Sequence, residues 1–282
     1  MSVWFITGAS RGFGLQIARE ALSRGDSVVA TARNPQTVID ALPDAGDRLV
    51  AVPLDVNDAT EVSAAVDTAV ERFGRIDVLV NNAGRGLLGA IEEVSDEEVR
   101  AVFDVNVFGL LSVTRAVLPQ MRAQRSGLII NLSSVGGFVA WPGWGAYSAT
   151  KFAVEAFSEA MTAELAPLGI RAVAVEPGPF RTDFLAAGSL EIAATQIEDY
   201  ADSGGAARQW ASDNNNAQEG DPLKAAKIIV DLADQDDLPE RIQLGSSAFN
   251  DVAEKLARTA RDQEAWREIS LSTDFPADAV TR

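Results

Sequence analysis

Residues 3–14 read VWFITGASRGFG and decide the fold of this chain. The apolar run Val3–Thr7 has the length and composition of a buried strand, and Gly8, Gly12 and Gly14 follow it directly. Small residues at this point let the chain turn sharply into a helix and let backbone N–H groups approach a pyrophosphate. The stretch therefore predicts a strand, a phosphate-binding turn and a helix. The G-x-x-x-G-x-G spacing differs from the G-x-G-x-x-G fingerprint of dinucleotide-binding folds. The glycines alone could also end a helix or form an ordinary turn.

A strand followed by a helix recurs along the rest of the chain. Short runs rich in β-branched residues alternate with longer segments of helical spacing, which is typical of βα units. Continuous apolar runs such as Val78–Val80 suit strands that helices cover on both faces. We therefore expect one α/β domain over residues 1–282, a doubly wound parallel sheet of about seven strands with helices on both faces. The expected strands are Val3–Thr7, Ser27–Thr31, Leu49–Pro53, Val78–Asn81, Leu128–Leu132, Arg171–Val175 and Ile242–Leu244.

Two segments depart from this rhythm. Residues 183–220 are polar and include an asparagine run, which is typical of a long insertion that forms an active-site lid. The residues after about 250 form a carboxy-terminal extension beyond the last expected strand. Helix starts are predicted by Ser95 with Glu98, which form a capping box, and by Asp221 before Pro222 at a first helical position.

The charge of the chain bears on its partners. It carries 41 acidic and 24 basic residues, a formal net charge of −17. Such a surface repels nucleic-acid phosphates and anionic lipid headgroups, so we expect neither nucleic acid nor a membrane as a partner. No apolar run approaches the ~20 residues of a membrane span, and the strand starting at Val3 leaves no room for a leader peptide. We expect a cytoplasmic protein. A phosphorylated cofactor is still compatible, because backbone N–H groups and a few arginines can make a site locally basic.

The sequence contains no cysteine and no histidine. These absences exclude disulfides, thiolate and imidazole metal ligands, a cysteine nucleophile and a Ser-His-Asp triad, and we predict no metal site. Proton transfer near neutral pH then falls to tyrosine, lysine or a carboxylate with a shifted pKa. Of the 2 tyrosines, Tyr147 and Tyr200, the first lies in the helical segment Ala146–Leu165, four residues before Lys151.

The spacing of Tyr147 and Lys151 favours a catalytic pair. Side chains at positions i and i+4 lie above one another on a helix, so the ammonium can approach the phenol. A nearby cation lowers the pKa of tyrosine from its usual value of about 10, although such a pair is often only a solvated face. Ser134 favours catalysis because it follows the strand Leu128–Leu132, at the end of the sheet where open parallel sheets bind ligands. The side chain of the adjacent Ser133 is expected to face the other way.

Several motifs occur in the order found in one enzyme family. They are TGASRGFG at 7–14, Asn81–Gly84, Ser134, Tyr147–Lys151 and Pro177-Gly178. Over roughly residues 1–250 the chain resembles the short-chain dehydrogenase/reductase (SDR) family. The stretches Thr31–Arg33, Pro177–Thr182 and Leu244–Ser247 are similar to the branch that includes 17β-hydroxysteroid and retinol dehydrogenases. The resemblance implies a Rossmann fold and an oxidoreductase that interconverts a ketone or aldehyde and an alcohol.

The expected cofactor is NADP(H). After the second strand, Thr31–Arg33 offers no carboxylate for the ribose 2′-hydroxyl of NAD, whereas Arg33 and Arg11 can pair with a 2′-phosphate. The resemblance implies that Asp55 contacts the adenine and Thr182 the nicotinamide carboxamide; taken singly, these residues could be a strand-end cap and a polar turn residue. The expected cofactor-binding residues are Gly8, Ser10, Arg11, Gly12, Phe13, Gly14, Arg33, Asp55, Val56, Asn82, Ala83, Gly84, Tyr147, Lys151, Pro177, Gly178 and Thr182.

The resemblance assigns catalysis to Asn106, Ser134, Tyr147 and Lys151. Ser134 and Tyr147 would hydrogen-bond the substrate oxygen, and Tyr147 would give its proton to the developing alkoxide. Lys151 would hold ribose hydroxyls and lower the pKa of Tyr147, and Asn106 would support a water chain to the lysine. A mid-helix asparagine is otherwise unfavourable unless it faces solvent.

Aromatic residues flank the expected catalytic groups and favour an apolar, fairly bulky substrate, although they could equally be core or interface residues. They are Phe138, Trp141, Trp144, Phe180 and Phe184. The family commonly packs the helices beginning near Ser95 and Ala146 against a partner, so we expect a homodimer or homotetramer. One alternative is a non-catalytic NADP(H)-binding regulatory or scaffold protein, which the presence of both Tyr147 and Lys151 disfavours. Another is a nucleotide-sugar epimerase or dehydratase, which the glycine spacing disfavours.

Overall fold

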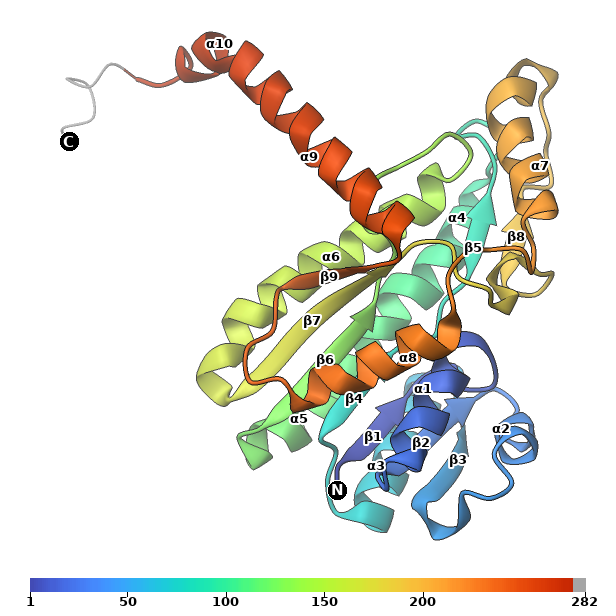
Figure 1. The fold of residues 1–282 in the computed structure, drawn as a ribbon, viewed down its shortest axis with the longest axis vertical. Helices are drawn as coiled ribbons and strands as arrows, with labels where there is room; N and C mark the ends of the chain where they lie inside the picture. Colours follow the sequence, from blue (N-terminus) through green and yellow to red (C-terminus); the bar gives the residue numbers. More distant parts are fainter. Residues whose placement is uncertain (276–282) are drawn as a thin grey trace.

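The computed structural model describes residues 1–275. Its centre is a sheet of seven parallel strands in the order β3-β2-β1-β4-β6-β7-β9 (Figure 1). The strands are β1 Val3–Ile6, β2 Ser27–Ala32, β3 Leu49–Pro53, β4 Val78–Asn81, β6 Gly127–Leu132, β7 Ile170–Pro177 and β9 Arg241–Leu244. The predicted doubly wound parallel sheet is confirmed, and each predicted strand overlaps an observed one.

Helices cover both faces of this sheet (Figure 1). Because successive side chains of a strand point to opposite faces, Trp4 and Ile6 lie in the core beneath α1 and α8, whereas Phe5 lies in the core beneath α3, α5 and α6. Two apolar cores explain why continuous apolar runs such as Val78–Val80 occur in the central strands. The helices from α1 to α6, with α8, are α1 Gly12–Ser23, α2 Gln36–Ala41, α3 Ala59–Phe73, α4 Asp96–Phe103, α5 Leu110–Gln124, α6 Gly145–Leu165 and α8 Pro222–Asp231.

The strand order reverses between β1 and β4, because the chain runs from β1 to β2 on one side and from β4 to β6 on the other. Open parallel sheets bind ligands at the carboxyl ends of their strands beside such a switch point. At this edge the hydroxyl of Thr7 accepts hydrogen bonds from the backbone N–H groups of Asn82 and Ala83, both at 2.9 Å. These bonds tie the glycine turn after β1 to the loop after β4.

A two-stranded parallel sheet lies beside the main one, formed by β5 (Gly86–Leu88) and β8 (Leu190–Ile192). These two strands were not predicted from the sequence, because three residues are too few to show an alternating pattern. β8 belongs to the predicted insertion 183–220, which also contains α7 (Ala206–Asp213). The insertion is therefore built of regular elements and pairs with the loop after β4.

Both predicted helix starts are confirmed. Ser95 and Glu98 form a capping box at the start of α4, with each side chain bonded to the other's backbone N–H. Asp221 caps α8 by accepting from the N–H groups of the second and third helical residues, and Pro222 occupies the first helical position.

The helix that follows Ser95 is longer and more apolar than expected. α4, a π-helical turn at Asp104–Gly109 and α5 form one continuous helix, Asp96–Gln124, in which an 18-residue window has a mean hydropathy of 1.6. By length and mean hydropathy this helix could cross a membrane, although charged residues interrupt it and it contains no continuous apolar run of about 20 residues. Of that window, 44% is buried inside the protein, where α5 packs against α3 and the sheet. Buried core helices of folded domains commonly reach this length and mean hydropathy as well.

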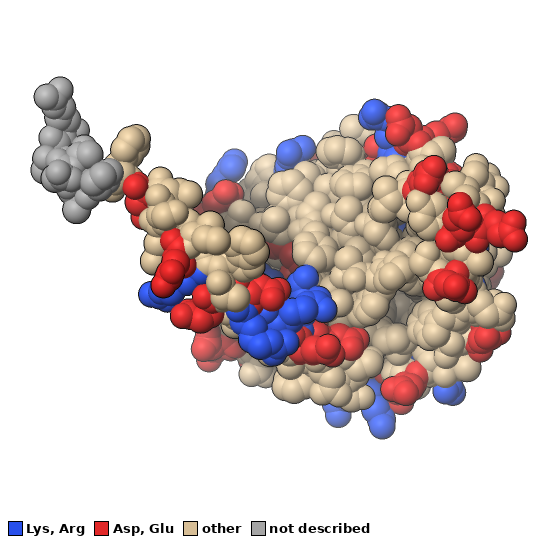
Figure 2. All heavy atoms as spheres, turned by 90° about the horizontal axis from the view of Figure 1, so that it is seen from above, with Lys and Arg blue, Asp and Glu red and all other residues tan. Residues whose placement is uncertain are grey.

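The chain after β9 leaves the body of the domain. α9 (Ser246–Ala265) starts against the sheet edge, where Ala248 and Val252 are buried, and then projects outward to α10 (Arg267–Leu271) (Figure 1). Figure 2 shows the molecule from above. Uncharged residues cover the centre of this face, and acidic side chains lie along the edge opposite the arm. The predicted extension after about 250 is thus a helical arm, and residues 276–282 lie outside the described part of the chain.

Candidate active site

Glycines hold the turn after β1 in shape. Gly8 and Gly12 have positive φ angles of 64° and 56°, a conformation that favours glycine. A Cβ atom on Gly14 would lie 2.5 Å from Nδ2 of Asn82, so the first turn of α1 approaches the loop after β4 only because no side chain intervenes. The same amide donates to the carbonyl oxygens of Thr7 at 2.8 Å and Gly8 at 3.0 Å.

The amino terminus of α1 fits a phosphate group. Arg11 occupies the N-cap position without a side-chain cap, so within residues 1–275 no side chain accepts from the first N–H groups of the helix. These N–H groups and the helix dipole attract an anion. The turn opens onto a cavity of about 1090 Å³. The predicted cofactor-binding residues that line it are Gly8, Ser10, Arg11, Gly12, Phe13, Arg33, Asp55, Val56, Asn82, Ala83, Gly84, Tyr147, Lys151, Pro177, Gly178 and Thr182. Gly14 does not line the cavity, because its role is the close packing just described.

The two predicted phosphate-pairing arginines differ in their surroundings. Arg11 lines the cavity but already donates to the carbonyl oxygen of Gly188 at 3.0 Å, in the turn before β8. Arg33 is exposed at the cavity margin, and within residues 1–275 its guanidinium forms no ion pair or hydrogen bond. The guanidinium of Arg33 can therefore bind a ligand without first breaking another interaction. Arg11, in contrast, joins the glycine turn to the insertion.

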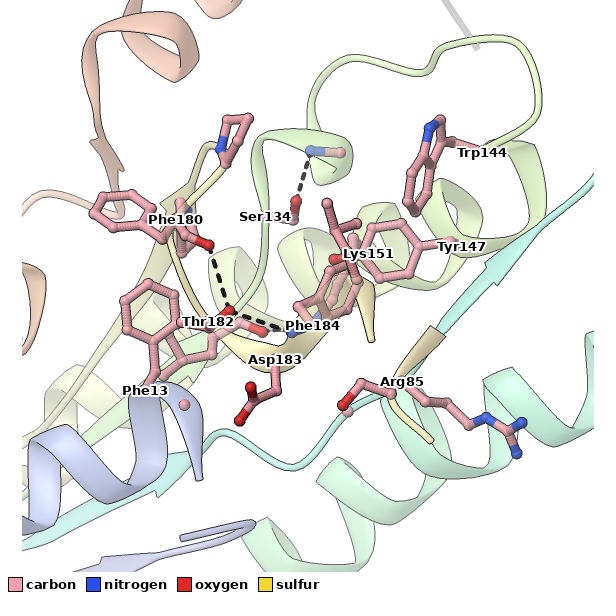
Figure 3. A pocket seen from close by; sticks show the side chains of 18 of the residues that line it. Phe13, Arg85, Ser134, Trp144, Tyr147, Lys151, Phe180, Thr182, Asp183 and Phe184 are labelled. Carbon is pink, nitrogen blue, oxygen red and sulfur yellow. Dashed lines mark hydrogen bonds between the residues drawn. The ribbon is translucent and has the colours of Figure 1, made fainter. Parts of the chain in front are cut away.

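The predicted catalytic side chains converge at the ends of β6 and α6 (Figure 3). Ser134 follows β6, and its hydroxyl accepts from the backbone N–H of Gly136 at 3.0 Å. A Cβ atom on Gly136 would lie 3.3 Å from both Ser134 Oγ and Cε1 of Tyr147, so serine and tyrosine flank this glycine closely. Nζ of Lys151 lies 5.9 Å from the centre of the Tyr147 ring and donates to the carbonyl oxygen of Leu132 at 2.7 Å.

Burial is the largest influence on the pKa values of Tyr147 and Lys151. It raises the pKa of Tyr147 to about 12, and the nearby Ser134 hydroxyl opposes that rise. Burial also lowers the pKa of Lys151 to about 8, which the negative charge of Glu155 partly opposes. The expectation of a lowered tyrosine pKa is not met in the chain alone, because desolvation of the phenolate outweighs a lysine about one helical turn away. A neutral Tyr147 is nevertheless the form that a proton donor requires.

Asn106 lies in the π-helical turn between α4 and α5, and it is buried rather than facing solvent. Its Nδ2 donates to the carbonyl oxygen of Arg85 and to Thr150 Oγ1, both at 2.9 Å, and its Oδ1 accepts from the Arg85 N–H at 2.8 Å. A Cβ atom on Gly84 would meet Asn106 Oδ1 at 3.2 Å and Lys151 Nζ at 3.8 Å. Asn106 and Lys151 thus flank the same glycine, and π-turns are frequent at functional sites.

Aromatic rings form one wall of the cavity beside Tyr147 (Figure 3). The ring of Tyr147 lies 5.8 Å from Trp144 and 5.4 Å from Phe184, measured between ring centres. Phe180 packs at 5.2 Å against Phe13, nearer the glycine turn. Trp141 lines the cavity and is partly exposed.

The prediction for Phe138 was wrong, because this residue does not line the cavity. It packs with Val135, Ala248 and Val252 at the base of α9, and the Arg241 guanidinium lies 5.7 Å from its ring centre. Phe138 lies near the predicted catalytic serine in the sequence, but the short helical turn after Ser134 carries its side chain away from the site.

Several cavity residues were absent from the predicted site. Leu185, Ala207 and Trp210 come from the insertion, and Ser247 and Asp251 come from the first turns of α9. Apolar residues within a polar insertion, Trp210 above all, indicate side chains that face a cavity. Ser247 and Asp251 reach the cavity only because β9 places α9 beside it, and no local sequence pattern indicates this.

The strand order, and a cavity that joins the glycine turn after β1 to Ser134, Tyr147 and Lys151, are typical of dinucleotide-dependent oxidoreductases. Residues 2–191 match the family model described as short chain dehydrogenase, and the chain belongs to this family. The resemblance inferred from the motifs is thereby confirmed.

Similar proteins agree with this membership. Oxidoreductase BOA17 of Botryotinia fuckeliana is 38% identical over 272 residues, which cover 96% of this chain and 98% of that protein. The 3-ketodihydrosphingosine reductase of Bacteroides thetaiotaomicron is 43% identical over 198 residues, covering 70% of this chain and 71% of the reductase.

Solved structures share the fold. A short-chain dehydrogenase from Streptomyces avermitilis is 41% identical with a TM-score of 0.91, covering 97% of this chain and 99% of that one. A 3-ketoacyl-(acyl-carrier-protein) reductase from Brucella melitensis, complexed with NADH, is 28% identical with a TM-score of 0.74 and coverages of 86% and 96%. An alcohol dehydrogenase from the archaeon Thermococcus sibiricus, complexed with 5-hydroxy-NADP, is 27% identical with a TM-score of 0.70 and coverages of 86% and 96%. The neighbours thus include both nicotinamide dinucleotide types.

Proposed function

We propose that this protein is an NADP(H)-dependent reductase or dehydrogenase that interconverts a ketone or aldehyde with an alcohol on an apolar, fairly bulky substrate. The observation that carries the proposal is the close approach of Ser134 and Tyr147 across Gly136, above Lys151, in the cavity that begins at the uncapped end of α1. Two hydroxyl groups that face one point can hydrogen-bond one substrate oxygen.

Each side chain has a distinct task in this reaction. The nicotinamide, when bound, supplies or accepts the hydride. Ser134 and Tyr147 orient the carbonyl oxygen, and Tyr147, neutral because of its raised pKa, donates its proton as the oxygen gains negative charge. Lys151 stabilises the phenolate left behind and holds ribose hydroxyls, and Asn106 supports the path that returns a proton to the lysine. Alcohol oxidation uses the same groups in reverse.

The preference for NADP(H) is argued from Arg33. Its guanidinium has no partner within the described residues and lies just after β2, where enzymes specific for NAD carry a carboxylate. Backbone N–H groups of the turn would hold the pyrophosphate, Asp55 and Val56 would line the adenine site, and Thr182 would face the carboxamide.

The apolar substrate is argued from the aromatic wall beside Tyr147 and from Leu185 and Trp210 in the insertion. The similarity to a 3-ketodihydrosphingosine reductase supports a ketone. We further propose a homodimer or homotetramer, because Phe108, Phe152 and Phe157 lie exposed on the helices that the family commonly packs against a partner.

A substrate screen tests the proposal. Purified protein is mixed with NADPH or NADH and a panel of ketones and aldehydes that differ in chain length and bulk, and loss of reduced cofactor is followed by absorbance. Turnover with NADPH that improves with apolar bulk supports the proposal. Tight NADPH binding without turnover of any carbonyl or alcohol would favour the non-catalytic alternative.

A further inference from the structure

The catalytic face of α6 continues one turn beyond Lys151 to a buried acid that the proposed reaction does not use. Tyr147, Lys151 and Glu155 follow at intervals of four residues and share one helix face. Three consecutive residues at the end of β6 meet this face. Ser134 meets Tyr147, the Leu132 carbonyl oxygen accepts from Lys151 Nζ, and the Ser133 hydroxyl meets Glu155 closely enough to affect its pKa.

Glu155 faces a second buried carboxyl group. Glu155 is only 5% exposed, and Glu176 of β7 is fully buried. Oε2 of Glu176 accepts from Gln243 Nε2 at 2.6 Å. Among residues 1–275, Oε1 of Glu176, both oxygens of Glu155 and the Ser133 hydroxyl have no hydrogen-bond partner.

The surrounding cations do not neutralise both acids. Arg241 of β9 lies 3.9 Å from Glu155 Oε2 but bonds to the exposed Glu159 of α6 at 2.7 Å. Nζ of Lys151 donates a hydrogen bond to the Leu132 carbonyl oxygen at 2.7 Å. Two carboxylates that face each other, with one guanidinium 3.9 Å from Glu155 and bonded to Glu159, would repel each other in a poorly solvated site. Burial, and then the charge and nearness of Glu176, raise the pKa of Glu155 to about 8. A proton between the two acids gives the partnerless oxygens a donor and removes one buried charge.

We propose that Glu155 and Glu176 share one proton at neutral pH and act as a positioning pair that sets the negative charge behind Lys151. The inference rests on the proposed function, because the charge of Lys151 matters to turnover only if Lys151 is catalytic. With one proton the pair carries a single negative charge. When that proton leaves, Glu155 also becomes negative and supports the Lys151 ammonium, so the lysine keeps its charge to higher pH.

Two substitutions that each remove one carboxylate have opposite effects in this account. Glu155→Gln keeps a hydrogen-bond donor towards Glu176 but prevents any charge at position 155, so the pKa of Lys151 falls. Glu176→Gln removes the neighbouring charge that keeps Glu155 protonated, so Glu155 ionises at lower pH and the pKa of Lys151 rises.

The first experiment measures kcat against pH for the full-length protein with an accepted ketone. The alkaline limb should move down by about 0.5–1 pH unit in Glu155→Gln and up by a similar amount in Glu176→Gln. Glu164→Gln is the matched control, because it makes the same change near the end of α6 on an exposed side chain that forms no ion pair within residues 1–275, and its limb should stay in place. Glu155→Leu should lower kcat at neutral pH, and Glu155→Gln should restore most of that loss. Shifts in the same direction, or no shift in either variant, would overturn the proposal.

The second experiment is independent of turnover and compares the unmodified protein with Glu155→Gln. Infrared spectra recorded from pH 6 to pH 10 should show a protonated-carboxyl C=O band at pH 7 that disappears with a midpoint near 8, and Glu155→Gln should remove it. The absence of that band at pH 7 would refute the shared proton. A band without turnover of any substrate would instead refute the proposed function while leaving the proton pair in place.

Discussion

Arg208 of α7 and Glu93, in the loop between β5 and α4, form a buried ion pair with Nη1–Oε2 and Nη2–Oε1 distances of 2.6 and 3.2 Å. The same carboxylate accepts from the backbone N–H groups of Ala90 at 2.8 Å and Ile197 at 3.0 Å. One side chain of the body therefore binds two residues of the insertion, Arg208 and Ile197. This attachment places α7 and Trp210 at the cavity.

Removal of the Glu93 charge should release the insertion. Breaking a buried ion pair by removing one partner costs about 3–5 kcal/mol, and here the cost falls on residues 196–213. In Glu93→Gln, amide hydrogen exchange in this segment should accelerate, and the KM for an apolar substrate should rise. Glu92→Gln is the matched control, because Glu92 is exposed and accepts only from the Tyr200 hydroxyl among the described residues. Equal exchange in the two variants would show that the pair does not hold the insertion.

Acid should release the same segment in the parent protein. The hydrogen bond from Arg208 holds the pKa of Glu93 at about 2, below the usual 4.5. The ionised group therefore stabilises the fold fully above about pH 4.5, and this contribution is lost as pH falls toward 2. Limited proteolysis with an acid-active protease should cut residues 196–213 faster at pH 3 than at pH 5. The pH dependence should largely vanish in Glu93→Gln, and a parent-like dependence in that variant would contradict the assignment.

Arg33→Ala should reduce the preference for NADPH over NADH. Each charge-assisted hydrogen bond to a phosphate contributes about 1.5–3 kcal/mol, so the ratio of the kcat/KM values should fall by about 10- to 100-fold. Arg19→Ala serves as the control, because Arg19 is an exposed cation of α1 that bonds Gln16 and does not line the cavity. An unchanged ratio in Arg33→Ala would remove the argument for NADP(H).

Gly136→Ala should slow turnover without unfolding the protein. The added methyl group would lie 3.3 Å from both Ser134 Oγ and the Tyr147 ring, so one of them has to shift. Misplacement of a catalytic group by about 1 Å can cost about 10²-fold in rate, and we expect kcat to fall at least tenfold with a nearly unchanged melting temperature. Gly205→Ala, whose added methyl group meets its nearest neighbour at 3.6 Å, should retain parent-like kcat. A parent-like kcat in Gly136→Ala would argue against close positioning of this pair.

The sequence predicted those parts of the molecule that local pattern determines. Seven strands followed from apolar runs, and the cap at Ser95 followed from residue spacing. Asn106 was proposed from family resemblance, but its bonds to Arg85 and Thr150 join segments far apart in the chain and have no local signal. The misplacement of Phe138 has the same cause, since a single turn after Ser134 decides which side of the sheet edge it meets.

The pairing of β5 with β8 and the buried acids behind Lys151 illustrate the remaining gap. A three-residue strand has too little pattern to be recognised, and its partner lies about a hundred residues away in the chain. Glu155 and Glu176 are ordinary glutamates in the sequence, and only the packing of α6 on β7 makes them buried neighbours. Burial and long-range contact therefore decide their chemistry.

Tyr147→Phe tests the central claim most directly. The variant removes one hydroxyl group, the proposed proton donor, and leaves the glycine turn, Arg33 and Lys151 in place. General acid catalysis alone contributes about 10²–10⁴ in rate, and the lost hydrogen bond to the alkoxide adds to that. The measurement is kcat with an accepted ketone beside the Kd for NADPH from fluorescence titration. The account predicts a loss of kcat of at least this size with a nearly unchanged Kd, and turnover within a few-fold of the parent would show that Tyr147 is not the acid.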